Sequence, residues 1–236
     1  NSSAHVANPG IYKDMRYDVL RDFTNLALLG GGPNVLMVGP QAGWKTLKDF
    51  VDAAKASPGK LNFASAGIGS GTHFNGEMFK AAVGLDIVHV PYKGTGDALL
   101  DTAAGRSAYY WSPLGLTLPF IKDNRLIPLA VSTAERAPLM PDVPTAAESG
   151  YPAVVYDHWY GMMAPGKTPR AIVEQVSREV GRILAMPDIR QRFAEQGVVP
   201  RSSTPAEFDK FIADEVVRLG AVVKAEQWHN TQLLNF

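Results

Sequence analysis

Short apolar runs alternate with amphipathic segments through roughly the first two thirds of the chain. The apolar runs are typical of buried strands, and apolar positions spaced three and four apart are typical of helices. The strands predicted in this way span residues 23–29, 34–38, 61–64, 87–90, 108–111, 126–132 and 159–164. One helix is predicted to begin after Thr46, and three more are predicted at residues 72–83, 97–104 and 114–121. Residues 1–25 are predicted to be rich in loops. This alternation indicates a parallel sheet covered by helices.

The last third of the chain has helical periodicity only. Helices are predicted for residues 169–186, for 188–196 and from Thr204 to about residue 226. Thr204-Pro205-Ala206-Glu207 is a capping-box sequence with Pro at the first helical position. The chain is expected to pass from a first lobe to a second near residues 38–40 and to return near residues 156–161, which predicts two lobes with a hinge. The first lobe is predicted to comprise residues 1–38 and 156–236, with the C-terminal helices packing on it, and the second lobe residues 39–155.

Composition and charge exclude several classes of function. The 236 residues carry 23 Lys and Arg against 23 Asp and Glu, so no basic surface for nucleic acid is expected. No apolar run has the length of a membrane span, and residues 1–9 lack the pattern of a signal peptide. Because the chain has no cysteine, disulfides, thiolate metal sites and cysteine nucleophiles are excluded.

The segment Ser65–His73 is the strongest candidate for a binding site. It follows a predicted strand, contains three glycines and leads into a helix, whose N-terminal N–H groups attract anions. Glycine-containing or polar turns also follow the next two strands, at Pro91–Gly96 and Trp111–Gly115. In a parallel sheet these turns share one edge, so we expect a site of backbone N–H and hydroxyl groups suited to a carboxylate. The alternative is that the glycines only satisfy the geometry of tight turns.

Individual side chains leave alternatives open. His73 could donate to a ligand or act as a local structural partner, and Lys93 could be catalytic or an exposed charge. Asp157 could pair with a ligand amine or be a solvated carboxylate. Aromatic residues at strand ends could line a cleft or pack between lobes; they are Tyr92, Trp111, Trp159 and Tyr160. No histidine pair has metal-ligand spacing on one helix, so we predict no metal site. A nucleophile elbow, a dinucleotide fingerprint and a P-loop are all absent.

Four segments together resemble the Bug family, the extracytoplasmic substrate-binding receptors of tripartite tricarboxylate transporters. They are Asn62–His73, Ile87–Gly94, Leu139–Glu148 and Thr204–Phe208, and the similarity runs from Asn8 to about Lys224. The resemblance implies a type II periplasmic-binding-protein fold whose two lobes close on an organic acid. It also implies that two turns, one from each lobe, clasp a carboxylate of the ligand.

The resemblance and the turn chemistry together give a set of predicted ligand-binding residues. They are Ser3, His5, Ser65, Ala66, Gly67, Gly69, Ser70, Thr72, His73, Tyr92, Lys93, Gly94, Ser112, Asp157 and Trp159. Family members begin with strands and an anion-binding turn that precede the loop at which this sequence starts. The resemblance therefore implies an N-terminally truncated receptor that lacks half of the clasp. Residues 227–236 are unlike the usual ending, and Ala108 stands where the family has Asp.

We therefore expect a periplasmic, non-enzymatic receptor that captures a small organic carboxylate in the cleft between its lobes. It is expected to be a monomer without cofactors, to present its ligand to membrane transporter subunits, and not to insert into the membrane itself. We do not expect a signal peptide within the sequence itself. The alternatives are a ligand-sensing regulatory module on the same fold and an enzyme that uses His73 or Lys93.

Overall fold

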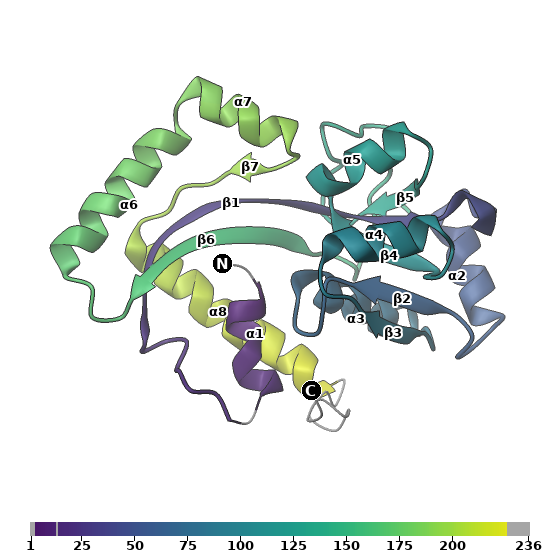
Figure 1. Cartoon of the computed structure of the whole chain (residues 1–236), viewed down its shortest axis with the longest axis horizontal. Coiled ribbons are helices and arrows are strands. Elements are labelled where there is room, and N and C mark those ends of the chain that lie inside the picture. The colour runs from purple at the N-terminus through teal and green to yellow at the C-terminus, as the bar shows by residue number, and fades with distance from the viewer. Residues whose placement is uncertain (1–2, 13, 226–236) are drawn as a thin grey trace. The chain divides into compact units, whose positions relative to one another are not determined.

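The structure is a computed structural model that describes residues 3–12 and 14–225. Residues 227–236, which are unlike the usual family ending, lie outside this range. The chain divides into two compact units (Figure 1). Unit 1 combines the chain up to Gly31 with Trp159–Phe193 and the segment from Val199 on, and unit 2 combines Gly32–His158 with Ala194–Val198. Residues 32–38 and 156–158 thus group with unit 2, and the lobe boundaries drawn from the sequence stay a prediction.

Unit 2 is built on a sheet with the strand order β3-β2-β4-β1-β5. These strands are β1 (Phe23–Val38), β2 (Asn62–Ser65), β3 (Val88–Pro91), β4 (Tyr109–Pro113) and β5 (Ile127–Val131). β2 runs parallel to β3 and to β4, whereas β1 is antiparallel to both β4 and β5. The sheet is therefore rich in parallel pairs but not purely parallel, and three strands bring their carboxyl ends to one edge.

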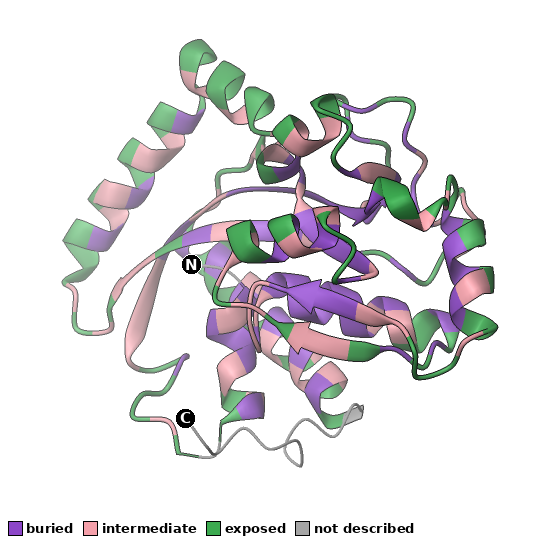
Figure 2. Cartoon of the chain, turned by 45° about the vertical axis from the view of Figure 1, so that its right-hand side comes forward, coloured by how far each residue is buried: buried purple, intermediate pink, exposed green. Residues whose placement is uncertain are grey.

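Helices cover both faces of this sheet. They are η1 (Pro40–Ala42), α2 (Leu47–Lys55), α3 (Gly71–Val83), α4 (Thr95–Ala103) and α5 (Leu114–Lys122). On one face Phe50 of α2 and Phe79 of α3 pack with Phe63 and Trp111 of the strands. The other face carries a second apolar cluster that includes Leu99 of α4 and Leu114 of α5. Figure 2 shows the resulting buried layer along the strands, and the arrangement confirms the predicted α/β fold class.

Unit 1 consists mainly of helices with short strand pairings. Its elements are α1 (Ser3–Ile11), the first part of β1 up to Gly31, most of β6 (Asp157–Pro165), α6 (Arg170–Leu184), most of α7 (Pro187–Glu195), β7 (Val199–Pro200) and α8 (Pro205–Ala225). Helices α1 and α8 lie side by side (Figure 1). Trp159 packs against Phe208 and Phe211 of α8. Unit 1 therefore has its own core. Among the described residues, no helix combines the length and apolar character that a membrane crossing needs.

Two local predictions were wrong. Residues 3–11, predicted as loop, form helix α1 although Pro9 and Gly10 lie within it. Packing explains this, because a Cβ on Gly10 would already contact Val223 of α8 at 3.4 Å. The strands predicted at 23–29 and 34–38 are one strand, β1, which continues through Gly30-Gly31-Gly32-Pro33. A Cβ on Gly32 would lie 2.5 Å from the Gly197 carbonyl oxygen, so glycine there permits close backbone approach rather than a turn.

The predicted helix caps are confirmed. Thr46 and Asp49 form a reciprocal capping box at α2. At α8 the Glu207 N–H donates to Thr204 Oγ1 at 3.2 Å, and the Thr204 N–H donates to the Glu207 carboxylate at 2.8 Å. These sequence signals are local, which explains why they could be located without knowledge of the tertiary structure.

Candidate functional site

The β2–α3 turn, residues 66–70, connects the carboxyl end of β2 to the start of α3. Gly67 and Gly69 have φ values of 119° and 75°, which side chains other than glycine rarely adopt. Ser70 is the N-cap of α3, and its hydroxyl accepts the His73 N–H at 3.2 Å. Because β2 pairs in parallel with β3 and β4, the turns after all three strands share one edge, as predicted.

Most amides of the β2–α3 turn already have acceptors inside the protein. Hydrogen bonds run from Ala66 N–H to Thr72 Oγ1 (2.9 Å), from Gly67 N–H to Ser65 Oγ (3.1 Å), from Gly69 N–H to His73 Nδ1 (3.2 Å) and from Ser70 N–H to the Gly67 carbonyl (3.1 Å). By contrast, the amides of Gly71 and Thr72, at the first two helical positions, have no hydrogen-bond partner within the described structure. These two amides, at the positive end of the helix dipole, are the groups best placed to hold an anion.

Four hydroxyl-bearing side chains from different elements gather at this edge; we call them the hydroxyl cluster. They are Thr72 of α3, Thr95 of α4, and Tyr110 and Ser112 of β4. Burial raises the pKa of Tyr110, and the three neighbouring hydroxyls oppose that rise. Their geometry nevertheless falls short of a hydrogen bond to the phenol. The oxygens of Tyr110 and Ser112 are therefore buried without a hydrogen-bond partner among the described residues. Buried hydroxyls without a partner are rare in folded proteins, and a ligand bound at this edge would supply one.

Gly71 lies against the side chains of Tyr156 and His158. A Cβ at this position would lie 2.7 Å from the Tyr156 hydroxyl and 3.0 Å from Nδ1 of His158. Burial lowers the pKa of His158 to about 4, so its ring is neutral near pH 7. The space beside the first helical residue is thus filled by two aromatic side chains, and only glycine fits.

One helical turn beyond Gly71, Asn75 Oδ1 accepts from Asn34 Nδ2 of β1 at 3.0 Å. Both side chains are fully buried. With the amides oriented in this way, Asn34 Oδ1 and Asn75 Nδ2 have no partner within the described part of the chain. The pair therefore presents one acceptor and one donor below the helix N-terminus.

Sequence reasoning missed several residues of this edge: Asn34, Asn75, Thr95, Tyr110, Tyr156 and His158. Tyr110 and Thr95 could have been found, because they lie next to turns already assigned to the edge. Tyr156 and His158 carry no local signal, because their proximity to Gly71 depends on the return of a distant segment.

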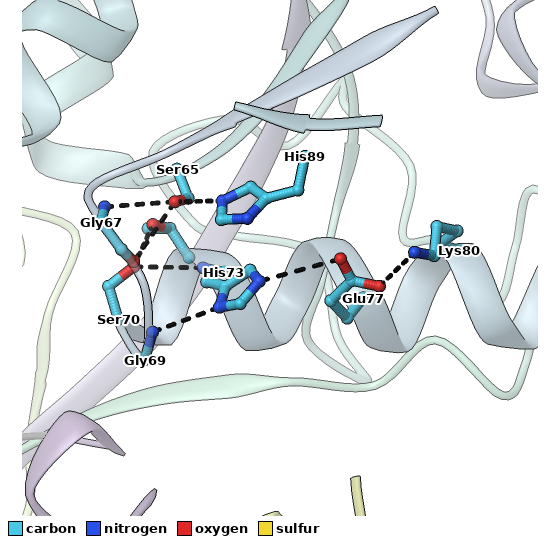
Figure 3. A network of polar contacts seen from close by, with 9 residues as sticks. Ser65, Gly67, Gly69, Ser70, His73, Glu77, Lys80 and His89 are labelled. Carbon is cyan, nitrogen blue, oxygen red and sulfur yellow. Dashed lines mark hydrogen bonds and ion pairs between the residues drawn. The ribbon is translucent and has the colours of Figure 1, made fainter. Parts of the chain in front are cut away.

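A buried polar network extends from the turn along α3 (Figure 3). Nε2 of His73 lies 3.7 Å from Glu77 Oε1, and Lys80 Nζ lies 2.5 Å from Glu77 Oε2. The His73 ring stacks on His89 with centroids 3.9 Å apart and planes at 15°. Burial is the main cause that lowers the pKa of His73 to about 2 and that of His89 to about 3. Both rings are therefore neutral near pH 7.

Donor atoms of His73, Glu77 and His89 lie within 4.8 Å of one another, a grouping compatible in residue type with a metal ion. The geometry fits poorly. Stacked imidazoles direct their lone pairs into parallel planes, so one ion cannot lie in both. Nδ1 of His73 already accepts the Gly69 N–H, and the Glu77 carboxylate is already paired with the Lys80 ammonium, so both groups have partners other than a metal ion. The three residues fit a hydrogen-bond network better than a metal centre.

The other residues predicted to bind a ligand are divided between the two units. In unit 2 the Tyr92 hydroxyl donates to Asp101 at 2.9 Å, and burial together with that carboxylate raises the pKa of Tyr92 to about 12. Lys93 is exposed, Gly94 precedes α4, and Asp157 begins β6. In unit 1 Ser3 and His5 lie on the buried side of α1, and the Trp159 indole N–H donates to Glu215 at 2.9 Å. The predicted contacts of Ser3, His5 and Trp159 with a ligand stay predictions.

Comparison with known proteins gives consistent matches. A family model described as "Tripartite tricarboxylate transporter family receptor" matches residues 1–227. The BugT protein of Bordetella pertussis is 34% identical over 208 residues, which are 88% of this chain and 64% of BugT. A protein from the tcbD-tcbE intergenic region of Pseudomonas sp. strain P51 is 31% identical over 219 residues, which are 92% of this chain and 65% of that protein. The chain thus spans less than two thirds of the length of these relatives.

Solved structures match closely in fold. Rpa4515 of R. palustris with adipate gives a TM-score of 0.89 at 31% identity, covering 94% of this chain and 74% of that one. MatC of Rhodopseudomonas palustris with bound malate gives 0.85 at 29% identity, covering 94% and 76%. The periplasmic binding protein BugD gives 0.87 at 25% identity, covering 95% and 76%.

Proposed function

Because this chain belongs to the tripartite tricarboxylate transporter receptor family, we propose that it binds a small organic carboxylate in the periplasm and delivers it to a transporter of the tripartite tricarboxylate type. Its fold is that of the type II periplasmic binding proteins, as the likeness to Rpa4515 and BugD shows. In this proposal the protein is a receptor without turnover. The cleft between lobes and the monomeric state, both expected from the sequence, stay predictions.

The N-terminus of α3 is the observation that carries the proposal. The amides of Gly71 and Thr72 lack partners among the described residues and lie beside the hydroxyl cluster. A carboxylate at a helix N-terminus gains about 0.3–1 kcal/mol from the dipole, and N–H and O–H donors to its oxygens add charge-assisted hydrogen bonds. The nearby imidazoles of His73 and His158 are neutral, so dipoles and hydroxyls rather than a counter-ion would hold the ligand.

The ligand class follows from the relatives and is transferred here as a proposal. Rpa4515 was solved with adipate and MatC with malate, and both ligands are dicarboxylates. We propose adipate, malate and related acids as the first candidates. Pocket size and individual side chains decide among such acids, so the choice requires a screen.

Binding is tested by thermal unfolding and titration calorimetry of the purified chain with mono- and dicarboxylic acids. We expect at least one acid to raise the unfolding temperature, and its uncharged diamide to have no effect. MatC with malate is the positive control for the assay. If no acid raises the unfolding temperature of this chain while malate raises that of MatC, the proposed function is wrong.

Ser112→Ala tests the site itself. The Ser112 hydroxyl has no partner in the described structure, so its removal should leave the free protein as stable as before. Loss of one hydrogen bond to the ligand should weaken binding by about fivefold. Ser57→Ala, in the turn after α2, is the matched control and should bind with unchanged affinity. Equal affinities of both variants and the wild type would remove Ser112 from the site.

The rival functions from the sequence remain distinguishable by experiment. An enzyme would consume the bound acid, which proton NMR of the mixture would detect over hours. A regulatory module would bind the acid but would not associate with the membrane subunits of a transporter in cross-linking experiments. The surroundings of His73, a neutral ring held by Gly69 and Glu77, favour neither rival.

A further inference from the structure

The stacked imidazoles of His73 and His89 hold the two glycines of the β2–α3 turn. His73 Nδ1 accepts the Gly69 N–H at 3.2 Å. His89 Nε2 lies 2.6 Å from Ser65 Oγ, and that same oxygen accepts the Gly67 N–H at 3.1 Å. Both glycines have φ in the left-handed region, a backbone conformation that other residues rarely adopt (Figure 3).

Glu77 and Lys80 determine which nitrogen of His73 carries the proton. A neutral imidazole has one N–H and one acceptor nitrogen. Glu77 Oε1 faces Nε2 at 3.7 Å and is itself paired with Lys80, so it is a charged acceptor that favours the proton on Nε2. Nδ1 then keeps the lone pair that Gly69 requires. Burial, which keeps the ring neutral, preserves this arrangement.

The same hydrogen bonds decide which amides a ligand can meet. With Gly67 and Gly69 bonded internally, the amides of Gly71 and Thr72 remain open at the start of α3. If Nδ1 of His73 were absent, the Gly69 N–H would be buried without an acceptor, which is costly, and rotation of the turn would relieve that cost.

We propose that His73 and His89 are positioning residues that turn the amides of Gly67 and Gly69 inward and thereby present Gly71 and Thr72 to the ligand. The proposal rests on the proposed function for the existence of a ligand, but the state of the turn is measurable without one. His73 then acts through the backbone, which differs from the direct ligand contact predicted from the sequence.

Nuclear magnetic resonance of the ligand-free chain tests the arrangement directly. Imidazole nitrogen shifts should show His73 with its proton on Nε2, and hydrogen exchange should show the Gly69 amide protected. His73→Ala should speed exchange of that amide by about tenfold, because its acceptor is lost. His73→Asn places an amide oxygen near the position of Nδ1 and should restore most of the protection.

Phe79→Leu, also on α3 but without a contact to the turn, controls for general destabilisation and should change Gly69 exchange only as much as the other amides of unit 2. A proton on Nδ1 in the wild type, or equal protection of Gly69 in His73→Ala, would overturn the proposal. If His73→Ala does not fold, the wild-type tautomer and the exchange of His73→Asn decide the question.

The ligand arm compares affinities for the acid found by the screen, beginning with adipate. His73→Ala should bind about tenfold more weakly and His73→Asn close to the wild-type value. Unchanged affinity in His73→Ala would show that the orientation of the Gly67 and Gly69 amides does not affect how the ligand binds at Gly71 and Thr72. If the wild type binds no acid, the proposed function fails, while the tautomer and exchange results still decide the positioning role.

Discussion

At the scale of the residue, buried histidines distinguish this chain. Burial lowers the pKa of His5, His73, His89 and His158, the last three to about 2, 3 and 4. The His73 ring needs the neutral form, because its Nδ1 accepts the Gly69 N–H. The sequence identified His73 as important but could not assign its role, because that role depends on Glu77 and His89 packing around it.

These histidines predict acid sensitivity. An unfolded histidine takes up a proton near pH 6.5, whereas the folded ring does so only at lower pH. The contribution to stability is therefore present above pH 6.5 and lost as the pH falls, by about 1.4 kcal/mol per pH unit for each of His73, His89 and His158 until the pH nears that ring's folded pKa. Urea unfolding at several pH values between 7.5 and 4.8 should show this decline before most carboxylates titrate. His73→Asn combined with His89→Gln should decline less steeply, and a flat profile in the wild type would contradict the prediction.

Gly71 predicts a steric effect. In Gly71→Ala the new methyl group would lie 2.7 Å from the Tyr156 hydroxyl, so the helix start or the tyrosine must move. We expect a loss of about 1–3 kcal/mol in unfolding free energy and weaker acid binding. Gly96→Ala in α4 is the control, because its Cβ meets no atom within 4 Å, and should be neutral or slightly stabilising. Equal stability of both variants would argue against the close packing at Gly71.

At the scale of the element, prediction succeeded where the signal is local. The predicted N-cap Thr46 marked the start of α2, and the predicted capping box at Thr204 marked that of α8. Alternating segments located the strands and helices of unit 2. It failed where tertiary packing overrides local preference. Pro9 and Gly10 read as a loop but belong to α1 because α8 packs against that helix. Gly30–Gly32 were expected to end a strand but lie within β1, where Gly32 permits the close approach of the Gly197 backbone.

The α8 cap predicts a measurable loss of stability. Thr204→Ala removes the hydroxyl that accepts the Glu207 N–H and should lower the unfolding free energy by about 0.5–2 kcal/mol. Thr204→Ser keeps the oxygen and should recover most of that loss. Urea midpoints of the three proteins provide the measurement. Equal midpoints for Thr204→Ala and the wild type would mean that the first turn of α8 contributes nothing to the transition that is observed.

At the scale of the whole molecule, each unit has its own buried core, and the site described here lies in unit 2. The family and its fold could be predicted because four motifs spread over the chain recur together. The hydroxyl cluster was predicted only in part: Thr72 and Ser112 were named, whereas Tyr110 and Thr95, next to turns assigned to the same edge, were missed. The ligand could not be predicted, since it depends on the space between side chains rather than on their types.

Ligand binding predicts a concentration-dependent stabilisation of the molecule. A ligand that binds only the folded state adds about 2.7 kcal/mol when its concentration is 100 times its dissociation constant. The urea midpoint of the wild type should therefore rise with the logarithm of the acid concentration. Ser112→Ala should need more acid for the same rise. A rise that does not depend on concentration would point to a general salt effect instead.

Lys93 offers a practical consequence. Its exposed side chain follows Tyr92 in the loop that leads to Thr95 of the hydroxyl cluster, and the sequence contains no cysteine. Lys93→Cys would thus be the single thiol of the protein, and an environment-sensitive fluorophore attached there would lie two residues from the cluster. Emission that changes when an acid arrives would make the chain an optical sensor, with which large collections of metabolites can be sorted without labelling any of them.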